Sequence, residues 1–156
     1  MIKKAVFPGS FDPITLGHVD IIQRGLQVFD EIVLAIGVNS AKNYFFSLEQ
    51  RKAFLEETFA GESRVSIDTY NELTVDYCKS IDAKYILRGL RSSKDFGYER
   101  PIAQTNRVMA GDIETVFLMC APEVTHISSS IVREIMSYNG NYQHLVPYAV
   151  RTENDS

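Results

Sequence analysis

Short apolar runs alternate with amphipathic segments along this chain. Glu31–Val38 is apolar at nearly every position, which is typical of a strand buried on both faces of a parallel sheet. Val65–Thr69 instead alternates between apolar and polar residues, which predicts an edge strand. Altogether the pattern predicts strands at Lys4–Phe7, Glu31–Val38, Val65–Thr69, Tyr85–Arg88 and Glu114–Met119, with Gly89 expected to break the fourth of them.

Helices are predicted in the intervals between these strands. The spacing of apolar residues places them at His18–Phe29, Ser47 to about Phe59, Leu73–Ile81, Phe96–Ala110 and Ser130–Asn139. Ser47 and Gln50 have the spacing of a capping box, and Gly140 stands where a glycine commonly ends a helix. Gly97 and Pro101 are poor residues for a helix interior, so the fourth helix is expected to begin late or to kink, which leaves the placement of Glu99 open.

Regular alternation of strand and helix is typical of an α/β fold with a parallel sheet. We expect one Rossmann-like domain at residues 1–150, with five strands in the order 3-2-1-4-5 and helices on both faces, and a polar tail at 151–156. Ligands of such sheets bind beyond the carboxyl ends of the strands, where the strand order reverses. That point lies between the first and fourth strands, so Gly9–His18 and Gly89–Asp95 are the loops expected to form a site.

The composition narrows the function classes. The chain has 156 residues, of which 45% are hydrophobic and 23% charged, as in ordinary globular proteins. Its net charge of −4 argues against a general nucleic-acid binder, because such proteins are usually basic. No apolar run has membrane-spanning length, and Pro8 and Gly9 interrupt the stretch that a signal peptide needs. We therefore expect a cytoplasmic protein with no membrane or nucleic-acid partner, in which Cys78 and Cys120 are buried, reduced thiols.

The run from Pro8 to His18 joins a predicted strand to a predicted helix and places Gly17 and His18 in the first helical turn. A helix N-terminus carries unpaired N–H groups and the positive end of the helix dipole, which together attract phosphate. His18 adds a side-chain donor, and Gly17 allows a ligand to approach the backbone. The alternative is structural, since glycine and proline are common in turns and a lone histidine can cap a helix.

Three more groups lie at the same edge of the predicted sheet. Arg88-Gly89-Leu90-Arg91 ends the fourth strand with two arginines, whose guanidinium groups match phosphate oxygens. Ile127-Ser128-Ser129-Ser130-Ile131-Val132-Arg133 leads into the last helix, where one serine can cap the helix and the others can offer hydroxyl and N–H groups to a phosphate chain. Lys42 follows the second strand. Each group alone has a structural explanation, but together they place positive charge in an acidic chain, which predicts a small polyanionic ligand.

At these positions the chain resembles a known family. Thr15-Leu16-Gly17-His18 resembles the (H/T)-x-G-H signature of the nucleotidylyltransferase superfamily, and the run from Ile127 to Arg133 resembles its I-S-S-S/T-x-x-R signature. Phe7–His18, Arg88–Arg91 and Asp95–Glu99 are similar to the bacterial phosphopantetheine adenylyltransferase family, in register from Met1 to about Val150. The resemblance implies reversible transfer of the adenylyl group of ATP to 4′-phosphopantetheine, which gives dephospho-coenzyme A and pyrophosphate in coenzyme A biosynthesis.

The resemblance also implies roles for individual residues. It makes His18 the transition-state stabiliser and gives catalytic roles to Lys42 and Arg91. It places phosphopantetheine at Ser10, Lys42, Thr74 and Arg88, and ATP at Ser10, Phe11, His18, Gly89, Leu90, Arg91, Glu99, Val124, Thr125, His126, Ile127, Ser128, Ser129 and Ser130. It further implies Mg²⁺ held mainly by the ATP phosphates with no metal site on the protein, a homohexamer, and feedback inhibition by coenzyme A.

The expected chemistry suits this set of residues. A phosphate nucleophile is largely ionised near neutral pH, because its second pKa is about 6, and it needs no general base. It needs relief from charge repulsion and in-line placement, which cations and N–H groups provide. Ser10 replaces the more usual threonine and keeps the hydroxyl. The alternatives are another acceptor, namely nicotinamide mononucleotide or, with CTP, glycerol phosphate, and a module that binds ATP without turnover.

Overall fold

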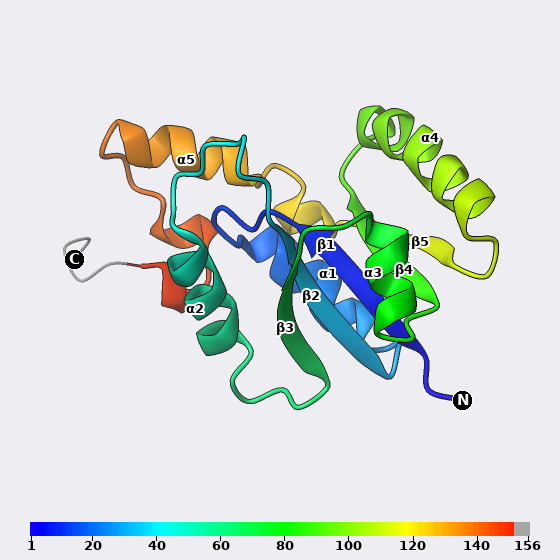
Figure 1. The fold of residues 1–156 in the computed structure, drawn as a ribbon. Coiled ribbons are helices and arrows are strands. Elements are labelled where there is room, and N and C mark those ends of the chain that lie inside the picture. Colours follow the sequence, from blue (N-terminus) through cyan, green and yellow to red (C-terminus); the bar gives the residue numbers. More distant parts are fainter. Residues whose placement is uncertain (152–156) are drawn as a thin grey trace.

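Five parallel strands form one sheet in the order β3-β2-β1-β4-β5, as the sequence predicts (Figure 1). The computed structural model describes residues 1–151, so the predicted tail lies outside the described residues except for Arg151. The strands are β1 (Lys4–Gly9), β2 (Glu31–Gly37), β3 (Val65–Tyr70), β4 (Tyr85–Leu90) and β5 (Glu114–Met119). The strand order reverses between β1 and β4, which places the expected site at that point of the sheet.

The helices between the strands lie close to their predicted positions. They are α1 (Leu16–Gly25), α2 (Leu48–Thr58), α3 (Thr74–Ser80), α4 (Ser93–Met109) and α5 (Ser129–Ser137), with short 3₁₀ helices η1 (Pro122–Val124), η2 (Gln143–Leu145) and η3 (Tyr148–Val150). The capping box predicted for α2 is present, with Ser47 and Gln50 each bonded to the backbone of the other. Within residues 1–151 no helix has the length and hydropathy of a membrane span.

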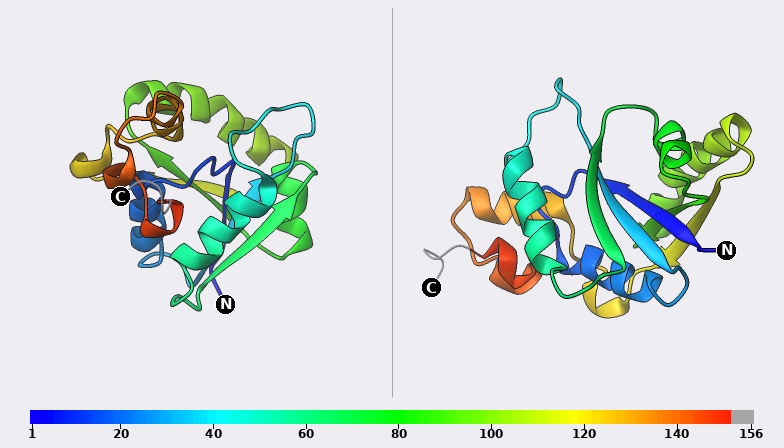
Figure 2. Two further views of the ribbon diagram at one scale, coloured as in Figure 1. Left: turned by 90° about the vertical axis from the view of Figure 1, so that its left-hand side faces the viewer. Right: turned by 60° about the horizontal axis from the view of Figure 1, so that its bottom comes forward.

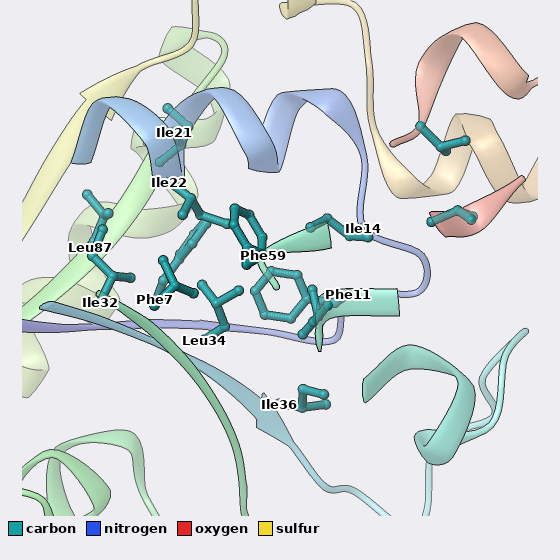
Figure 3. Packing of buried hydrophobic residues seen from close by; sticks show 14 of the residues in the cluster. Phe7, Phe11, Ile14, Ile21, Ile22, Ile32, Leu34, Ile36, Phe59 and Leu87 are labelled. Carbon is teal, nitrogen blue, oxygen red and sulfur yellow. The ribbon is translucent and has the colours of Figure 1, made fainter. Parts of the chain in front are cut away.

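Helices lie on both faces of the sheet (Figure 2). The alternation of side chains along the strands builds two cores, one on each face. Phe7, Ile32 and Leu34 point to the larger core, which α1, α2, α5 and the 3₁₀ helices cover (Figure 3). Val6, Val33 and Ala35 point to the smaller core, which α3 and the segment after α4 cover. Because β2 is buried on both faces, its apolar residues need no alternation.

The central strands separate toward their carboxyl ends. β1 pairs with β2 along its whole length, from Lys4 to Gly9. With β4 it pairs only through Ala5 with Tyr85 and Val6 with Ile86. Beyond these pairs the Pro8 carbonyl accepts a hydrogen bond from the Arg88 side chain in place of a backbone N–H. The gap between β1 and β4 therefore opens where the strand order reverses.

The predicted break at Gly89 and the late start predicted for the fourth helix are both wrong. β4 continues through Gly89 to Leu90, because the glycine at this position makes room for α1 and does not end the strand. α4 begins earlier than predicted, at Ser93, and runs through Gly97 and Pro101. Ser92 caps α4 by accepting the Asp95 N–H, and proline in its interior removes one backbone donor without ending it. Glu99 therefore lies within a continuous helix.

The ends of α5 and the states of the cysteines also differ in detail from expectation. Asn139, with φ of 57°, takes the left-handed position after α5 that the sequence assigns to Gly140. The Gly140 N–H then closes the motif by bonding the Ile135 carbonyl.

Cys78 is fully buried as predicted, whereas Cys120 follows β5 and is only partly buried. Both are free thiols.

Candidate functional site

A cleft of about 480 Å³ lies at the reversal point of the sheet, within the usual size range of small-molecule sites. The loop after β1, the start of α1, the end of β4 and the start of α5 form its walls. Of the residues predicted from the sequence, it brings together Ser10, Phe11, His18, Lys42, Arg88, Gly89, Arg91, Ile127, Ser128 and Ser129. The predicted phosphate-binding segments, far apart in the sequence, therefore share one cleft.

The N-terminus of α1 fixes the ring of His18. Thr15 is the N-cap of α1, and its own backbone N–H donates to Nδ1 of His18 across 3.0 Å. Since Nδ1 is the acceptor, the proton of a neutral His18 imidazole is on Nε2. The structure thus combines the two alternatives raised from the sequence, because His18 caps the helix with one ring nitrogen and leaves the other as a donor.

The charge state of His18 follows from its surroundings. Burial, followed by the positive charges of Arg88 and Arg91, lowers the pKa of the His18 imidazole from 6.5 to about 4. The ring also packs against Phe11, with 5.1 Å between the ring centroids, and against Phe7 at 6.2 Å. At neutral pH His18 therefore acts as an uncharged hydrogen-bond donor in the cleft.

Arg88 is the most constrained cation of the site. Its Nε and Nη2 donate to the two carboxylate oxygens of Glu99, at 3.1 and 2.5 Å, and its Nη1 donates to the Pro8 carbonyl at 2.6 Å. Glu99 is buried and lies on α4 between Gly97 and Pro101. The continuation of the helix through these two residues therefore determines where the carboxylate lies. A guanidinium group has five N–H donors, so two remain for a ligand oxygen.

Lys42 and Arg91 bring two more positive charges to the cleft from opposite sides. Lys42 Nζ donates to the Ser10 hydroxyl at 3.4 Å and is otherwise exposed. Arg91 Nε lies 3.6 Å from the Asp95 carboxylate, whose Oδ2 also accepts the Arg91 backbone N–H. An anion in the cleft thus meets cations from two separate segments, the loop after β2 with Lys42 and the end of β4 with Arg88 and Arg91.

The three serines at the start of α5 all make hydrogen bonds within the protein. Ser128 is the N-cap and accepts the Ile131 N–H, Ser129 Oγ donates to the Pro13 carbonyl, and Ser130 Oγ accepts from Arg133. The prediction that one serine caps the helix is confirmed. The Ser129 hydroxyl ties the start of α5 to the Pro13 carbonyl. The hydroxyls of Ser128 and Ser130 act as acceptors and keep their own O–H groups as donors, beside the backbone N–H groups of the helix start.

A second hollow of about 260 Å³ continues between β1, β4 and α4. Thr74, Arg88, Ser10 and Glu99 line it, and Thr74 exchanges a hydrogen bond of 2.9 Å with the Tyr70 hydroxyl. Its walls also include apolar surface from Ile86, Ile102 and Ala103. This hollow suits an elongated, mainly uncharged group attached to an anion in the cleft.

The remaining predicted residues lie around the cleft. Leu90 is buried, and its carbonyl accepts the Cys120 N–H. Val124 packs against the larger core, Thr125 lines a hollow beside Arg91, and His126 and Ser130 are exposed. Any contact of Leu90 or Val124 with a ligand therefore depends on the backbone.

Some residues of the cleft were missed in the sequence. Thr15 acts through a backbone N–H, which no side-chain pattern reveals, although it occupies the first position of the T-x-G-H run. Asp12 and Tyr98 also line the cleft and were not selected. Arg133 was noticed as a charge near the loops, and its guanidinium donates to the Asp12 carbonyl at 2.8 Å. In the sequence, Arg133 is the arginine of the I-S-S-S/T-x-x-R signature, which was the signal for it.

Comparisons with known proteins agree with this architecture. The cytidylyltransferase-like family model matches residues 6–135. The chain is 57% identical to a phosphopantetheine adenylyltransferase of Christiangramia forsetii over 96% of its own length and 99% of that protein. It is 58% identical to a phosphopantetheine adenylyltransferase of Flavobacterium johnsoniae, over 97% of its length and 99% of that relative.

A solved structure extends the comparison to the fold. A bifunctional NMN adenylyltransferase/ADP ribose pyrophosphatase from Francisella tularensis matches with a TM-score of 0.72 at 18% identity, over 94% of this chain and 45% of that chain. At this identity the match concerns the fold alone. Taken with the near-full-length relatives and the matched family model, the motifs assembled in the cleft show that the chain belongs to the phosphopantetheine adenylyltransferase family of cytidylyltransferase-like proteins.

Proposed function

We propose that the protein transfers the adenylyl group of ATP to 4′-phosphopantetheine, forming dephospho-coenzyme A and releasing pyrophosphate, a reversible step of coenzyme A biosynthesis. The observation that carries the proposal is a neutral His18, with Nε2–H as its donor, in a cleft with Lys42, Arg88 and Arg91. These groups stabilise negative charge without accepting a proton. They suit a reaction in which one phosphate attacks another.

The reacting atoms need no nucleophile from the protein. An oxygen of the 4′-phosphate attacks the α-phosphorus of ATP, a new P–O bond forms, and pyrophosphate leaves with the electron pair of the broken bond. Cys120 lines the cleft, but burial raises the pKa of its thiol, which disfavours the thiolate. The Asp12 carboxylate accepts the N–H groups of Phe45 and Phe46, both at 2.8 Å. The side chains of the cleft therefore bind and orient.

The two substrates are assigned to different walls. Ser10, Lys42 and Arg88 hold the phosphate of phosphopantetheine, and its arm extends past Thr74 into the second hollow. ATP is assigned to Phe11, Gly89, Leu90, Arg91, Glu99 and the segment Val124 to Ser130. His18 donates from Nε2 to the oxygens of the α-phosphate as charge builds there, with Lys42 and Arg91 as the neighbouring charges.

The Glu99 and Asp12 carboxylates near the cleft are already engaged within the protein, which supports a metal ion held mainly by the nucleotide phosphates. Among residues 1–151 there is no cluster of three or more metal-ligating side chains. Glu99 is paired with Arg88, and Asp12 is occupied by backbone N–H groups. Mg²⁺ bound to the ATP phosphates supplies neutralising charge for the leaving pyrophosphate. The residues of this chain then need only hold the outer phosphate oxygens.

Assembly, regulation and location complete the proposal. The proposed assembly is a homohexamer. Association between copies is supported by apolar side chains exposed on α4 and the edge strand β5, namely Phe96, Ile102, Val108, Met109 and Met119. Coenzyme A contains the product within its structure, so it is proposed to compete for the same cleft as a feedback inhibitor. The free thiols of Cys78 and Cys120 are consistent with the cytoplasm. Light scattering and inhibition assays test the first two points.

Pyrophosphate release tests the proposal directly. ATP and Mg²⁺ are offered with 4′-phosphopantetheine, nicotinamide mononucleotide or glycerol 3-phosphate in separate reactions, with CTP replacing ATP for the last. Turnover with phosphopantetheine alone is expected. Turnover with a different acceptor would keep the chemistry and replace the substrate, and saturable ATP binding without any turnover would identify a sensing module.

A further inference from the structure

Arg51 is a buried cation that the proposed chemistry does not use. It lies on α2, and only 3% of its surface is exposed. The ion pairs found among residues 1–151 do not include Arg51. Its guanidinium is therefore surrounded by uncharged groups and has no carboxylate partner within this part of the chain. Burial of a guanidinium without a carboxylate costs stability, which raises the question of what this residue does.

The contacts of Arg51 join two loops of the cleft. Nη1 donates to the Ser10 carbonyl at 2.9 Å, and Nε donates to the Phe46 carbonyl at 3.2 Å. The guanidinium also lies over the ring of Tyr44, with 4.0 Å from Cζ to the ring centroid. Tyr44 and Phe46 belong to the loop that carries Lys42, so one side chain connects the Lys42 loop to the Ser10 loop.

The bond to the Ser10 carbonyl determines the orientation of one peptide. The Ser10–Phe11 bond is trans, so its carbonyl and the Phe11 N–H point in opposite directions. Phe11 has φ of 48°, a left-handed conformation that is uncommon for a bulky residue and that its surroundings must hold. Among the hydrogen bonds of residues 1–151, the Phe11 N–H has no acceptor. Phe11 itself lines the cleft.

We propose that Arg51 is a positioning residue that holds the Ser10–Phe11 peptide with its N–H directed to a phosphate in the cleft, and that it fixes the Lys42 loop against the same peptide. This inference rests on the proposed function for the identity of the phosphate. Arg51 touches neither reacting group, and it acts through the carbonyls of Ser10 and Phe46. Its buried charge also makes the potential of the loop more favourable for an anion.

Two substitutions of Arg51 separate geometry from charge. Arg51→Met removes the donors and keeps much of the volume. Arg51→Lys keeps the charge but loses the planar fork that reaches two carbonyls. Leu55→Val, one turn further along α2 in the larger core, is the matched control, because it loosens packing without touching either loop.

Kinetics and amide shifts are the two readouts. Arg51→Met is expected to lower kcat/KM for ATP by about tenfold to a hundredfold, the range of a lost hydrogen bond to a charged group. Arg51→Lys is expected to remain defective, and Leu55→Val to keep kcat/KM while melting at a lower temperature. In protein labelled with ¹⁵N-phenylalanine, inorganic pyrophosphate is expected to shift the Phe11 amide signal in the wild type and not in Arg51→Met.

The outcomes distinguish this inference from the proposed function. A wild-type protein without turnover would overturn the proposed function, while the pyrophosphate shift of the Phe11 amide would still decide the role of Arg51. An Arg51→Lys protein with wild-type kinetics and shifts would overturn the positioning role. The same conclusion would follow if Leu55→Val lost kcat/KM as much as Arg51→Met does. If Arg51→Met does not fold, Arg51→Lys carries the test alone with the same two readouts.

Discussion

Gly89 of β4 faces Ile21 of α1 so closely that a Cβ atom at position 89 would lie 2.9 Å from Cγ1 of Ile21. Ile21 is almost fully buried, and Gly89 is partly buried. The helix that carries His18 is therefore packed directly on the strand that carries Arg88. This contact sets the distance between the two sides of the cleft.

Replacement of Gly89 by alanine is expected to destabilise the protein by about 1–3 kcal/mol, because the added methyl group overpacks the contact with Ile21. Gly97→Ala is the matched control. A Cβ at Gly97 meets no atom within 4 Å, and alanine in a helix interior is favoured over glycine by about 0.5–1 kcal/mol. Urea unfolding should thus move in opposite directions for the two variants, and a stable Gly89→Ala protein would contradict the close-packing argument.

The pair of Arg88 and Glu99 predicts a second contrast. Glu99→Gln is expected to lower the free energy of unfolding by about 1–3 kcal/mol, because it leaves a half-buried guanidinium without its carboxylate. It should also raise the KM for phosphopantetheine, since Arg88 loses its fixed orientation. Glu114→Gln breaks the exposed pair with Arg107 and should change stability by less than about 0.5 kcal/mol. Equal changes in the free energy of unfolding for Glu99→Gln and Glu114→Gln would show that burial of the Arg88–Glu99 pair adds nothing to stability.

His18→Ala is expected to reduce kcat by about 10²–10³, the usual effect of removing one donor to a developing oxyanion. The KM for ATP should change much less, because the donor acts on charge that forms in the transition state. His144→Ala, at an exposed position on η2, is the histidine control and should keep the wild-type rate. Steady-state assays of pyrophosphate release measure both variants, and a normal rate for His18→Ala would remove His18 from the mechanism.

Titration of His18 gives a prediction about pH. Since folding lowers its pKa from 6.5 to about 4, the unfolded chain takes up a proton between these values while the folded protein does not. The free energy of unfolding should therefore fall as the pH falls from 6.5 toward 4, and this part of the decline should be missing in His18→Gln. NMR of the imidazole C–H signals should show a midpoint near 4 for His18 in the ligand-free protein. A midpoint at or above 6.5 would contradict the lowered pKa of the His18 imidazole.

Much of the fold could be predicted because strand and helix signals were local. The apolar run of β2, the alternation of β3 and the capping box of α2 each lie within a few residues. The strand order then placed the loops of His18 and Arg88 at one edge. What the sequence did not reveal depends on tertiary contacts, such as the packing of α1 that lets β4 continue through Gly89.

The errors in the candidate site have the same origin. Local preference argues against a helix through Gly97 and Pro101, yet α4 is continuous there. This helix brings the Glu99 carboxylate within hydrogen-bond distance of the Arg88 guanidinium. An arginine on a helix is usually exposed, and only the fold shows that Arg51 is buried and bonded to the Ser10 carbonyl. A charged residue can be assigned such a role only when the carbonyls it serves are known.

The short pairing of β1 with β4 gives this sheet a seam. On one side of β1 a full ladder joins it to β2, while on the other side the backbone contributes pairs only at Ala5 and Val6. Beyond these pairs, the two halves are held by side chains such as Arg88 on the Pro8 carbonyl. On the proposed function, a phosphate bound between the Ser10 loop and the end of β4 would connect the two strands where backbone pairs are missing. Substrate binding should then raise the free energy of unfolding by joining the two halves of the sheet.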